Sequence, residues 1–301
     1  MRCLFSIFSI VYGVWKKIEI LNFKKVHYIL SKIIDYFEKM TQIYENTSND
    51  LFYLANFYEF QNKELLVCIH GNSSCAETFS EILSGFSGVL QTVAIDLPGC
   101  GRSKRLPEYS MELVAEVVSN FINSFNAPRV HLFGHSLGGH LLTFLDITPG
   151  LIILAGTPPL SSAVDFSTAF KPDSEAIELL PLLSLDRRFE EDEARKFVLH
   201  TGVVGPVSDL MIQYAIETDP LFRKGCLSSL ANLDQMKWLS ESRNVIIFHG
   251  ELDGVINLQY LQTIPQNLLF EGVIHCLPCK HMSPLLQANT IIATIRRALM
   301  I

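Results

Sequence analysis

Short apolar runs rich in β-branched residues alternate with segments of helical periodicity along this 301-residue chain, and this alternation constrains the fold most. The runs are continuous rather than alternating in polarity, as in strands that are buried on both faces of a parallel sheet. The expected strands are 51–60 (one or two strands), 65–70, 91–96, 129–134, 151–155, 244–249 and 268–273. The pattern therefore predicts an α/β fold with a mostly parallel, twisted sheet and helices on both faces.

Helical patterns lie between these runs. Residues 109–125 place apolar side chains on one face, and 137–145 and 284–300 are further expected helices. The alternation stops between residues 156 and 238, which hold several prolines and a charged cluster but no clear strand. We expect this segment to be a helical lid over the carboxyl edge of the sheet. The core domain would then comprise 46–155 and 239–301.

Residues 1–45 form an N-terminal extension outside this pattern. The first fifteen residues are apolar, but spanning a bilayer takes about 20 residues, and no small-residue cleavage site follows them. The helical periodicity of 16–40 permits a helix on a membrane surface. The favoured interpretation is that Met40 is the true start and that residues 1–39 are not native. No segment other than this extension is expected to contact a membrane.

Charge and cysteine content limit the partners and the compartment. The formal net charge of −7, without a long run of Lys or Arg, argues against nucleic acid as a partner. Seven irregularly spaced cysteines in a chain of this size are typical of reduced thiols in a cytoplasmic protein rather than of a disulfide framework. The sequence makes no prediction of the oligomeric state.

Gly134-His135-Ser136-Leu137-Gly138 matches G-x-S-x-G between an expected strand and an expected helix. A nucleophile on such a sharp turn has a strained backbone, so its neighbours must be small. The two glycines of the motif supply that space. The following helix directs its free N–H groups and the positive end of its dipole at the site. The pattern predicts that Ser136 is a nucleophile.

A serine nucleophile needs a base and a carboxylate that orients the base. Where the serine lies on a strand-to-helix turn of this kind, the acid follows it along the chain and the histidine follows the acid. Asp253 and His281 both lie in loops after expected strands, where open parallel sheets place their sites. They are the predicted acid and base. Glu251 and Asp96 are the competing acids; Glu251 comes early in its loop, and Asp96 is expected to organise the turn that it begins.

Two N–H donors must also face the oxyanion that develops on the attacked carbonyl. Leu137, directly after the nucleophile, and Asn72, in the loop after the strand 65–70, are the predicted donors through their backbone N–H groups. The side-chain amide of Asn72 is a further candidate. This mechanism implies no cofactor and no metal.

Taken in order, HGNSS (70–74), DLPGCGRS (96–103), GHSLGG (134–139), the acid loop at Asp253 and KHMSP (280–284) resemble the α/β-hydrolase superfamily from about Leu51 to the carboxyl terminus. This resemblance implies the fold and a hydrolytic triad. HGNSSCAETF, GHSLGGH and AGTPPL (155–160), with FKPD (170–173), are further similar to the α/β-hydrolase type of N-acyl-homoserine lactone lactonase. That narrower resemblance implies opening of a lactone ring by Ser136. Such relatives usually carry Glu where this chain has Asp253.

Other functions remain open on the sequence alone. The alternatives are a general carboxylesterase or thioesterase, an acyltransferase, and a ligand-binding protein on a hydrolase fold. A cluster of possible zinc ligands is formed by His275, Cys276, Cys279 and His281. The sequence has no second pair of ligands at zinc-finger spacing to complete such a site. The expected substrate is a small ester or lactone with an apolar acyl group. Its pocket would be lined from the lid by Phe166, Phe170, Leu179, Leu180, Phe189, Phe197 and Met211.

Overall fold

The computed structural model describes residues 42–162, 165–171, 173–242 and 244–301. The expectations for 1–41, namely the membrane-surface helix and the alternative start at Met40, lie outside the described residues. Within the described part, no helix has the length and apolar character needed to cross a membrane.

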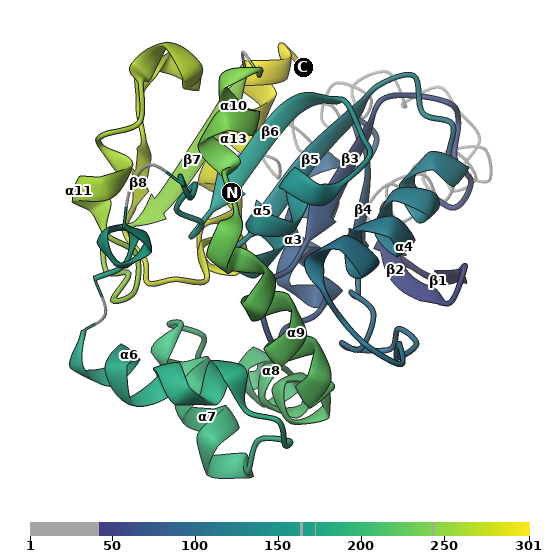
Figure 1. The fold of residues 1–301 in the computed structure, drawn as a ribbon. Coiled ribbons are helices and arrows are strands. Elements are labelled where there is room, and N and C mark those ends of the chain that lie inside the picture. The colour runs from purple at the N-terminus through teal and green to yellow at the C-terminus, as the bar shows by residue number, and fades with distance from the viewer. Residues whose placement is uncertain (1–41, 163–164, 172, 243) are drawn as a thin grey trace, which may run out of the picture. The chain divides into compact units, whose positions relative to one another are not determined.

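Eight strands form one sheet in the order β1-β2-β4-β3-β5-β6-β7-β8 (Figure 1). β1 and β2 pair in antiparallel fashion, β2 is antiparallel to β4, and all further pairs are parallel. This confirms the expected mostly parallel sheet. The strands are β1 Tyr44–Ser48, β2 Leu51–Ala55, β3 Leu65–Ile69, β4 Gln91–Ile95, β5 Val130–His135, β6 Pro149–Ala155, β7 Val245–Gly250 and β8 His275–Leu277.

The continuous apolar strands are explained by helices on both faces. In β3, Leu65 and Val67 belong to the core packed with α4 (Met111–Ser124) and α5 (Leu137–Leu141). Leu66 and Cys68 point the other way, into the core packed with α3 (Ser80–Phe86) and α13 (Ala288–Leu299). Because side chains alternate across a strand, both parities must be apolar when both faces are covered.

The last strand is displaced from its expected position. Residues 268–273 do not form a strand; η6 (Gln266–Leu268) and η7 (Phe270–Gly272) occupy this region instead. Glu271 and Gly272 have φ of 56° and 69°, which no extended strand accommodates. The expectation of a strand at 268–273, which rested on its apolar residues, is therefore wrong, and β8 begins at His275.

The first strand, β1, was not among the expected runs because its sequence, YENTS, is polar. Its side chains alternate between half-buried and exposed, as suits the edge of a sheet. Asn49 and Asp50, both with positive φ, turn the chain into β2. Asn and Asp tolerate this left-handed backbone in two-residue hairpin turns. The expected carboxyl-terminal helix is also split at Gln287, into α12 (Ser283–Leu286) and α13.

The segment between β6 and β7 is helical, and its described residues contain no strand. Figure 1 shows α6, α7 and α8 gathered below the sheet. Phe189, Val198, Met211 and Tyr214 belong to a separate small core of this lid. Its elements are η3 Phe166–Ala169, α6 Ser174–Leu179, η4 Leu180–Ser184, α7 Glu191–His200, α8 Pro206–Glu217, α9 Pro220–Ser228, η5 Ser229–Asn232 and α10 Gln235–Ser240. The other short helices are η1 Ala76–Phe79, η2 Leu142–Phe144 and α11 Leu258–Leu261.

The substitution Gly138→Ala should lower the free energy of unfolding by about 1–3 kcal/mol, because overpacking against a fixed wall costs that much. A Cβ at Gly138 would lie 2.4 Å from the backbone oxygens of Ile69 and His70. Gly85→Ala is the matched control, since its Cβ would meet only the flexible end of Ile292, at 2.2 Å. Urea denaturation of both variants measures the difference. Equal losses would refute this account of the turn.

Candidate active site

Ser136 lies on the sharp turn between β5 and α5, with φ 52° and ψ −122°. Three hydrogen bonds hold this strained backbone. The N–H of Ser136 donates to the carbonyl of Ala155 at 2.9 Å. The carbonyl of Ser136 accepts from the N–H of Gly139 and from Oγ1 of Thr157, both at 2.9 Å. The turn is thus fixed to the end of the neighbouring strand β6.

Small neighbours are a steric requirement of this turn. A Cβ at Gly134 would lie 2.4 Å from Cα of Gly139, and one at Gly139 would lie 2.2 Å from Oγ1 of Thr157. Gly71, in the loop after β3, is also tightly placed, because its Cβ would be 3.0 Å from Cβ of Ser136. The structure therefore brings the loop 70–74 against Ser136.

Asp253 and His281 form the hydrogen-bonded pair that the sequence predicts. Nδ1 of His281 lies 2.7 Å from Oδ2 of Asp253, whose side chain has no exposed surface. Oδ1 of Asp253 accepts from the backbone N–H groups of Val255 at 2.9 Å and Ile256 at 3.3 Å. Since a carboxylate only accepts hydrogen bonds, Nδ1 of His281 carries the proton and Nε2 is left with its lone pair.

The interaction between Asp253 and His281 shifts their pKa values in opposite directions. Burial by itself raises the pKa of Asp253, but the His281 charge, its hydrogen bond and the two backbone donors outweigh this and lower it to about 2. Burial by itself lowers the pKa of His281, but the charge of Asp253 and its hydrogen bond outweigh that and raise it. Asp253 therefore stays ionised and stabilises the imidazolium form of its partner.

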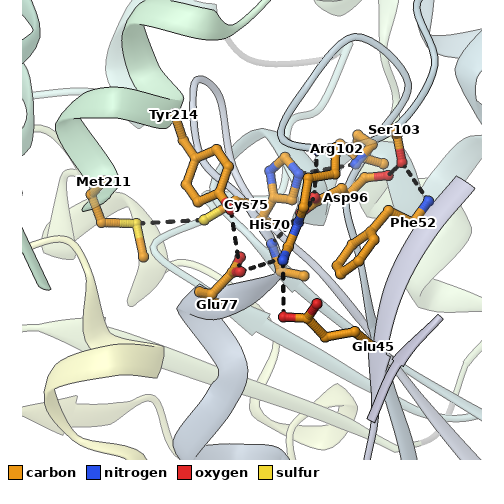
Figure 2. A network of polar contacts seen from close by, with 12 residues as sticks. Glu45, Phe52, His70, Cys75, Glu77, Asp96, Arg102, Ser103, Met211 and Tyr214 are labelled. Carbon is orange, nitrogen blue, oxygen red and sulfur yellow. Dashed lines mark hydrogen bonds and ion pairs between the residues drawn. The ribbon is translucent and has the colours of Figure 1, made fainter. Parts of the chain in front are cut away.

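The competing acids lie in other settings. Glu251 is exposed. In Figure 2, Asp96 lies at the centre of a separate polar network. Its Oδ1 accepts from the N–H of Ala76 at 2.7 Å and its Oδ2 from the N–H of Arg102 at 2.8 Å. Burial raises the pKa of Asp96 although these donors oppose it. Asp96 thus organises its turn, as expected.

Arg102 extends this network toward the lid. It forms ion pairs with Glu45 on β1 and with Glu77 on η1, and its guanidinium lies 3.5 Å from the ring centre of Phe52 (Figure 2). Glu77 also accepts a hydrogen bond of 3.4 Å from the hydroxyl of Tyr214 on α8. These contacts attach the lid helix α8 to the part of the core that follows the loop 70–74.

Asn72 and Leu137, the predicted oxyanion donors, both line the cavity that contains Ser136. The side chain of Asn72 is already engaged: Nδ2 donates to the carbonyl of Leu183 in the lid at 3.4 Å, and Oδ1 accepts from the hydroxyl of Ser73 at 3.1 Å. His70 holds the same loop, since its Nδ1 donates to the carbonyl of Gly71 at 2.7 Å. The backbone N–H of Asn72 remains the candidate donor.

His135 is a site residue that the sequence interpretation missed. Its Nε2 lies 3.1 Å from the backbone carbonyl of His281 and donates to it, which fixes the loop that carries His281. Burial lowers the pKa of His135 to about 3, so this ring stays neutral. The one sequence signal of this role is the position of His135 inside G-x-S-x-G. At this position, the alternation of side chains along β5 directs the ring toward the neighbouring loops.

The cavity beside Ser136 and His281 has a volume of about 500 Å³. Five of the lid residues expected there do line it: Phe170, Leu179, Leu180, Phe197 and Met211. The expectation for Phe189 is wrong. Its ring lies under the buried guanidinium of Arg223, 4.2 Å from the ring centre, and packs in the core of the lid. The side chain of Phe166 lies outside the described part of the structure.

The residues of the hypothetical zinc cluster are engaged or separated. Nδ1 of His281 binds Asp253, Cys276 is exposed and Cys279 is buried. Within the described ranges, no group of three His, Cys, Asp or Glu side chains is placed to hold a metal ion. The six cysteines described by the structure are all free thiols.

Comparison with known proteins establishes the family. Residues 66–289 match the model of the alpha/beta hydrolase family. This chain belongs to the alpha/beta hydrolase family. The membership confirms the expected fold and the expected superfamily. It leaves the roles of individual residues and the substrate to be argued from the site.

Individual proteins match this chain at low sequence identity. The chain is 28% identical over 110 residues to the chloroplastic protein PHYLLO of Arabidopsis thaliana, covering 32% of this chain and 6% of that protein. It is 32% identical over 202 residues to the 3-hydroxybutyrate-oligomer hydrolase of Cupriavidus necator, covering 60% of this chain and 68% of that protein. A structure of the N-acyl homoserine lactonase AidH, complexed with N-butanoyl homoserine, superposes with a TM-score of 0.72 at 21% identity, covering 86% and 96% of the two chains.

The substitution Asp253→Asn should lower kcat by about 10⁴-fold, because an amide no longer fixes the tautomer of His281 or stabilises its cation. Glu251→Gln is the matched control, since it also removes one carboxylate charge from the same loop, but at an exposed position. Steady-state hydrolysis of a p-nitrophenyl ester measures both. A large loss in Glu251→Gln together with an active Asp253→Asn would reverse the assignment of the acid.

Proposed function

We propose that this chain is a serine hydrolase that cleaves carboxylic esters or lactones through an acyl-enzyme. The observation that carries the proposal is the pair of the buried Asp253 carboxylate and His281, joined at 2.7 Å beside the cavity that Ser136 and His281 line. In the neutral imidazole, this pairing places the proton on Nδ1 and the lone pair on Nε2. A base so oriented, next to a serine on a strained turn, is suited to acyl transfer.

In the proposed first step, Oγ of Ser136 attacks the substrate carbonyl while Nε2 of His281 takes its proton. The imidazolium then passes this proton to the leaving alkoxide, and the acyl group stays on Ser136. In a lactone the alkoxide remains tethered to the acyl group as a hydroxyl. Water then attacks the acyl-enzyme with His281 again acting as base, which regenerates Ser136 and releases the acid.

The tetrahedral oxyanion is proposed to bind the backbone N–H groups of Asn72 and Leu137. Each lies in an element that flanks Ser136, and the amino terminus of α5 adds the positive end of its dipole. The hydrogen bond from Asn72 to the carbonyl of Leu183 joins this loop to the lid. Loss of one such oxyanion donor typically raises the barrier by about 2.7–4 kcal/mol.

For the substrate, we propose an N-acyl homoserine lactone. The narrower sequence resemblance, the similarity in fold to AidH and the apolar lid residues around the cavity support it. A second candidate is a general carboxylesterase acting on hydroxyacyl esters. The match to the 3-hydroxybutyrate-oligomer hydrolase favours this alternative. The substrates of both candidate activities are small molecules, and both activities require the same residues at the carbonyl.

A hydrolysis panel should separate these candidates. Purified protein is tested on acyl-homoserine lactones, on short and long p-nitrophenyl esters and on acyl thioesters. Preference for the lactones supports the first candidate, and activity restricted to simple esters supports the second. Ser136→Ala should reduce every activity by about 10⁶-fold, the scale on which removal of a triad serine acts. An undiminished Ser136→Ala variant would refute the mechanism.

The rate should fall as the pH is lowered. Because the pKa of His281 is raised above its ordinary value of 6.5, kcat/KM should lose activity along an acid limb whose midpoint lies above 6.5. Below that midpoint the imidazole is protonated and cannot accept the proton of Ser136. In Asp253→Asn the residual activity should show this limb at lower pH. A wild-type profile that is flat down to pH 5 would contradict the role of His281.

A further inference from the structure

His140 is a buried histidine that none of the proposed steps uses. It is the fourth residue of α5, and it lines the same cavity as Ser136, the residue that directly precedes this helix. One turn of an α-helix rises about 5.4 Å. His140 therefore lies about one helical turn from Ser136 on the wall of the shared cavity, within reach of a substrate whose carbonyl is bound at Ser136.

The tautomer of His140 is determined by a buried glutamine of the lid. Nε2 of Gln235 donates to the backbone carbonyl of Gly139 at 2.7 Å. This contact fixes the orientation of the amide, because a carbonyl only accepts. The other atom of the amide, Oε1 of Gln235, lies 3.0 Å from Nδ1 of His140 and accepts from it. Nδ1 of His140 therefore carries the hydrogen, and Nε2 is a hydrogen-bond acceptor.

The surroundings keep this ring neutral. Burial lowers the pKa of His140 to about 4, although the hydrogen bond with Gln235 opposes the shift. Among the described residues, Gln235 is the hydrogen-bond partner found for the ring. The cavity wall also contains Leu227, Leu230 and Val255, which offer no hydrogen bond. An acceptor in such a wall discriminates well, because a substrate without a donor leaves it unpaired and away from water.

We propose that Nε2 of His140 accepts a hydrogen bond from the bound substrate, and that the site thereby selects esters or lactones with a donor close to the carbonyl. The inference rests on the proposed function, since it takes the carbonyl to be bound at Ser136. Two donors fit this chemistry: the hydroxyl of a 3-hydroxyacyl group, and the N–H of an acylated amine. A neutral acceptor has no favourable contact with the oxyanion, so His140 acts in selection and not in charge stabilisation.

The test compares two pairs of p-nitrophenyl esters on the wild-type protein. One pair is 3-hydroxybutyrate and butyrate, and the other is N-acetylglycine and N-acetylsarcosine, in which a methyl group replaces the N–H. After correction for the uncatalysed rates, kcat/KM should favour the donor-bearing ester of at least one pair by about fivefold to tenfold, the effect of one neutral hydrogen bond. The pair that responds identifies hydroxyl or amide as the donor.

The substitution His140→Phe removes the acceptor and keeps a ring of similar shape. The preference should fall to about one, and any loss shared by both esters cancels in the ratio. Gln235→Leu is the second variant, for use if His140→Phe does not fold. Without Gln235 the proton is no longer held on Nδ1, so the preference should also fall. Thermal unfolding of each variant checks that the comparison is made on folded protein.

The outcomes separate this inference from the proposed function. If wild-type protein hydrolyses butyrate through Ser136 but prefers neither donor-bearing ester, His140 has no role in selection and the hydrolase assignment stands. A preference that persists unchanged in folded His140→Phe would overturn the inference in the same way. If no ester or lactone is hydrolysed, the proposed function fails and this inference fails with it.

Discussion

The left-handed backbone of Ser136 is the constraint on which the rest of the site depends. A non-glycine residue with φ 52° costs about 1–3 kcal/mol and persists only where its surroundings determine it. Here the hydrogen bonds to Ala155 and Thr157 supply that determination, and the glycines of the motif leave the room for it. The strain places the hydroxyl at the end of the sheet, where the cavity and the loop of His281 also lie.

Burial acts on the histidines of this region in two ways. His70, His135 and His140 have no carboxylate partner, so burial lowers their pKa values to about 4, 3 and 4 and leaves them neutral holders of loops and helices. His281 alone among these four faces a buried carboxylate, and its pKa is raised. The fold thus separates one histidine suited to proton transfer from three that keep a fixed tautomer.

Most of the fold was predictable from the sequence because the central strands are buried on both faces and therefore read as unbroken apolar runs. The edges were harder. β1 is polar because one side of it faces solvent, and β8 was misplaced because Glu271 and Gly272 interrupt an apolar run with left-handed backbone. Edge strands are defined by pairing partners and turns, which local hydrophobicity does not encode.

Residue type and chain order were enough to predict the hydrogen-bonded pair of Asp253 and His281, whereas the catalytic roles of Ser136, Asp253 and His281 stay predictions. Roles that depend on three-dimensional packing were not predictable. His135 holds the loop of His281, and the orientation of His140 depends on Gln235, which is 95 residues away in the sequence. Phe189 illustrates the reverse error, because an aromatic residue in a lid can equally well fill the core of that lid.

Trapping the nucleophile tests the central claim most directly. The protein is incubated with a fluorophosphonate, which phosphonylates an activated serine, and the modified peptide is mapped by mass spectrometry. The account predicts one adduct per chain, on Ser136, formed in parallel with loss of esterase activity and much more slowly in Asp253→Asn. Complete loss of activity with the adduct on another residue, or esterase activity that survives full modification of Ser136, would contradict it.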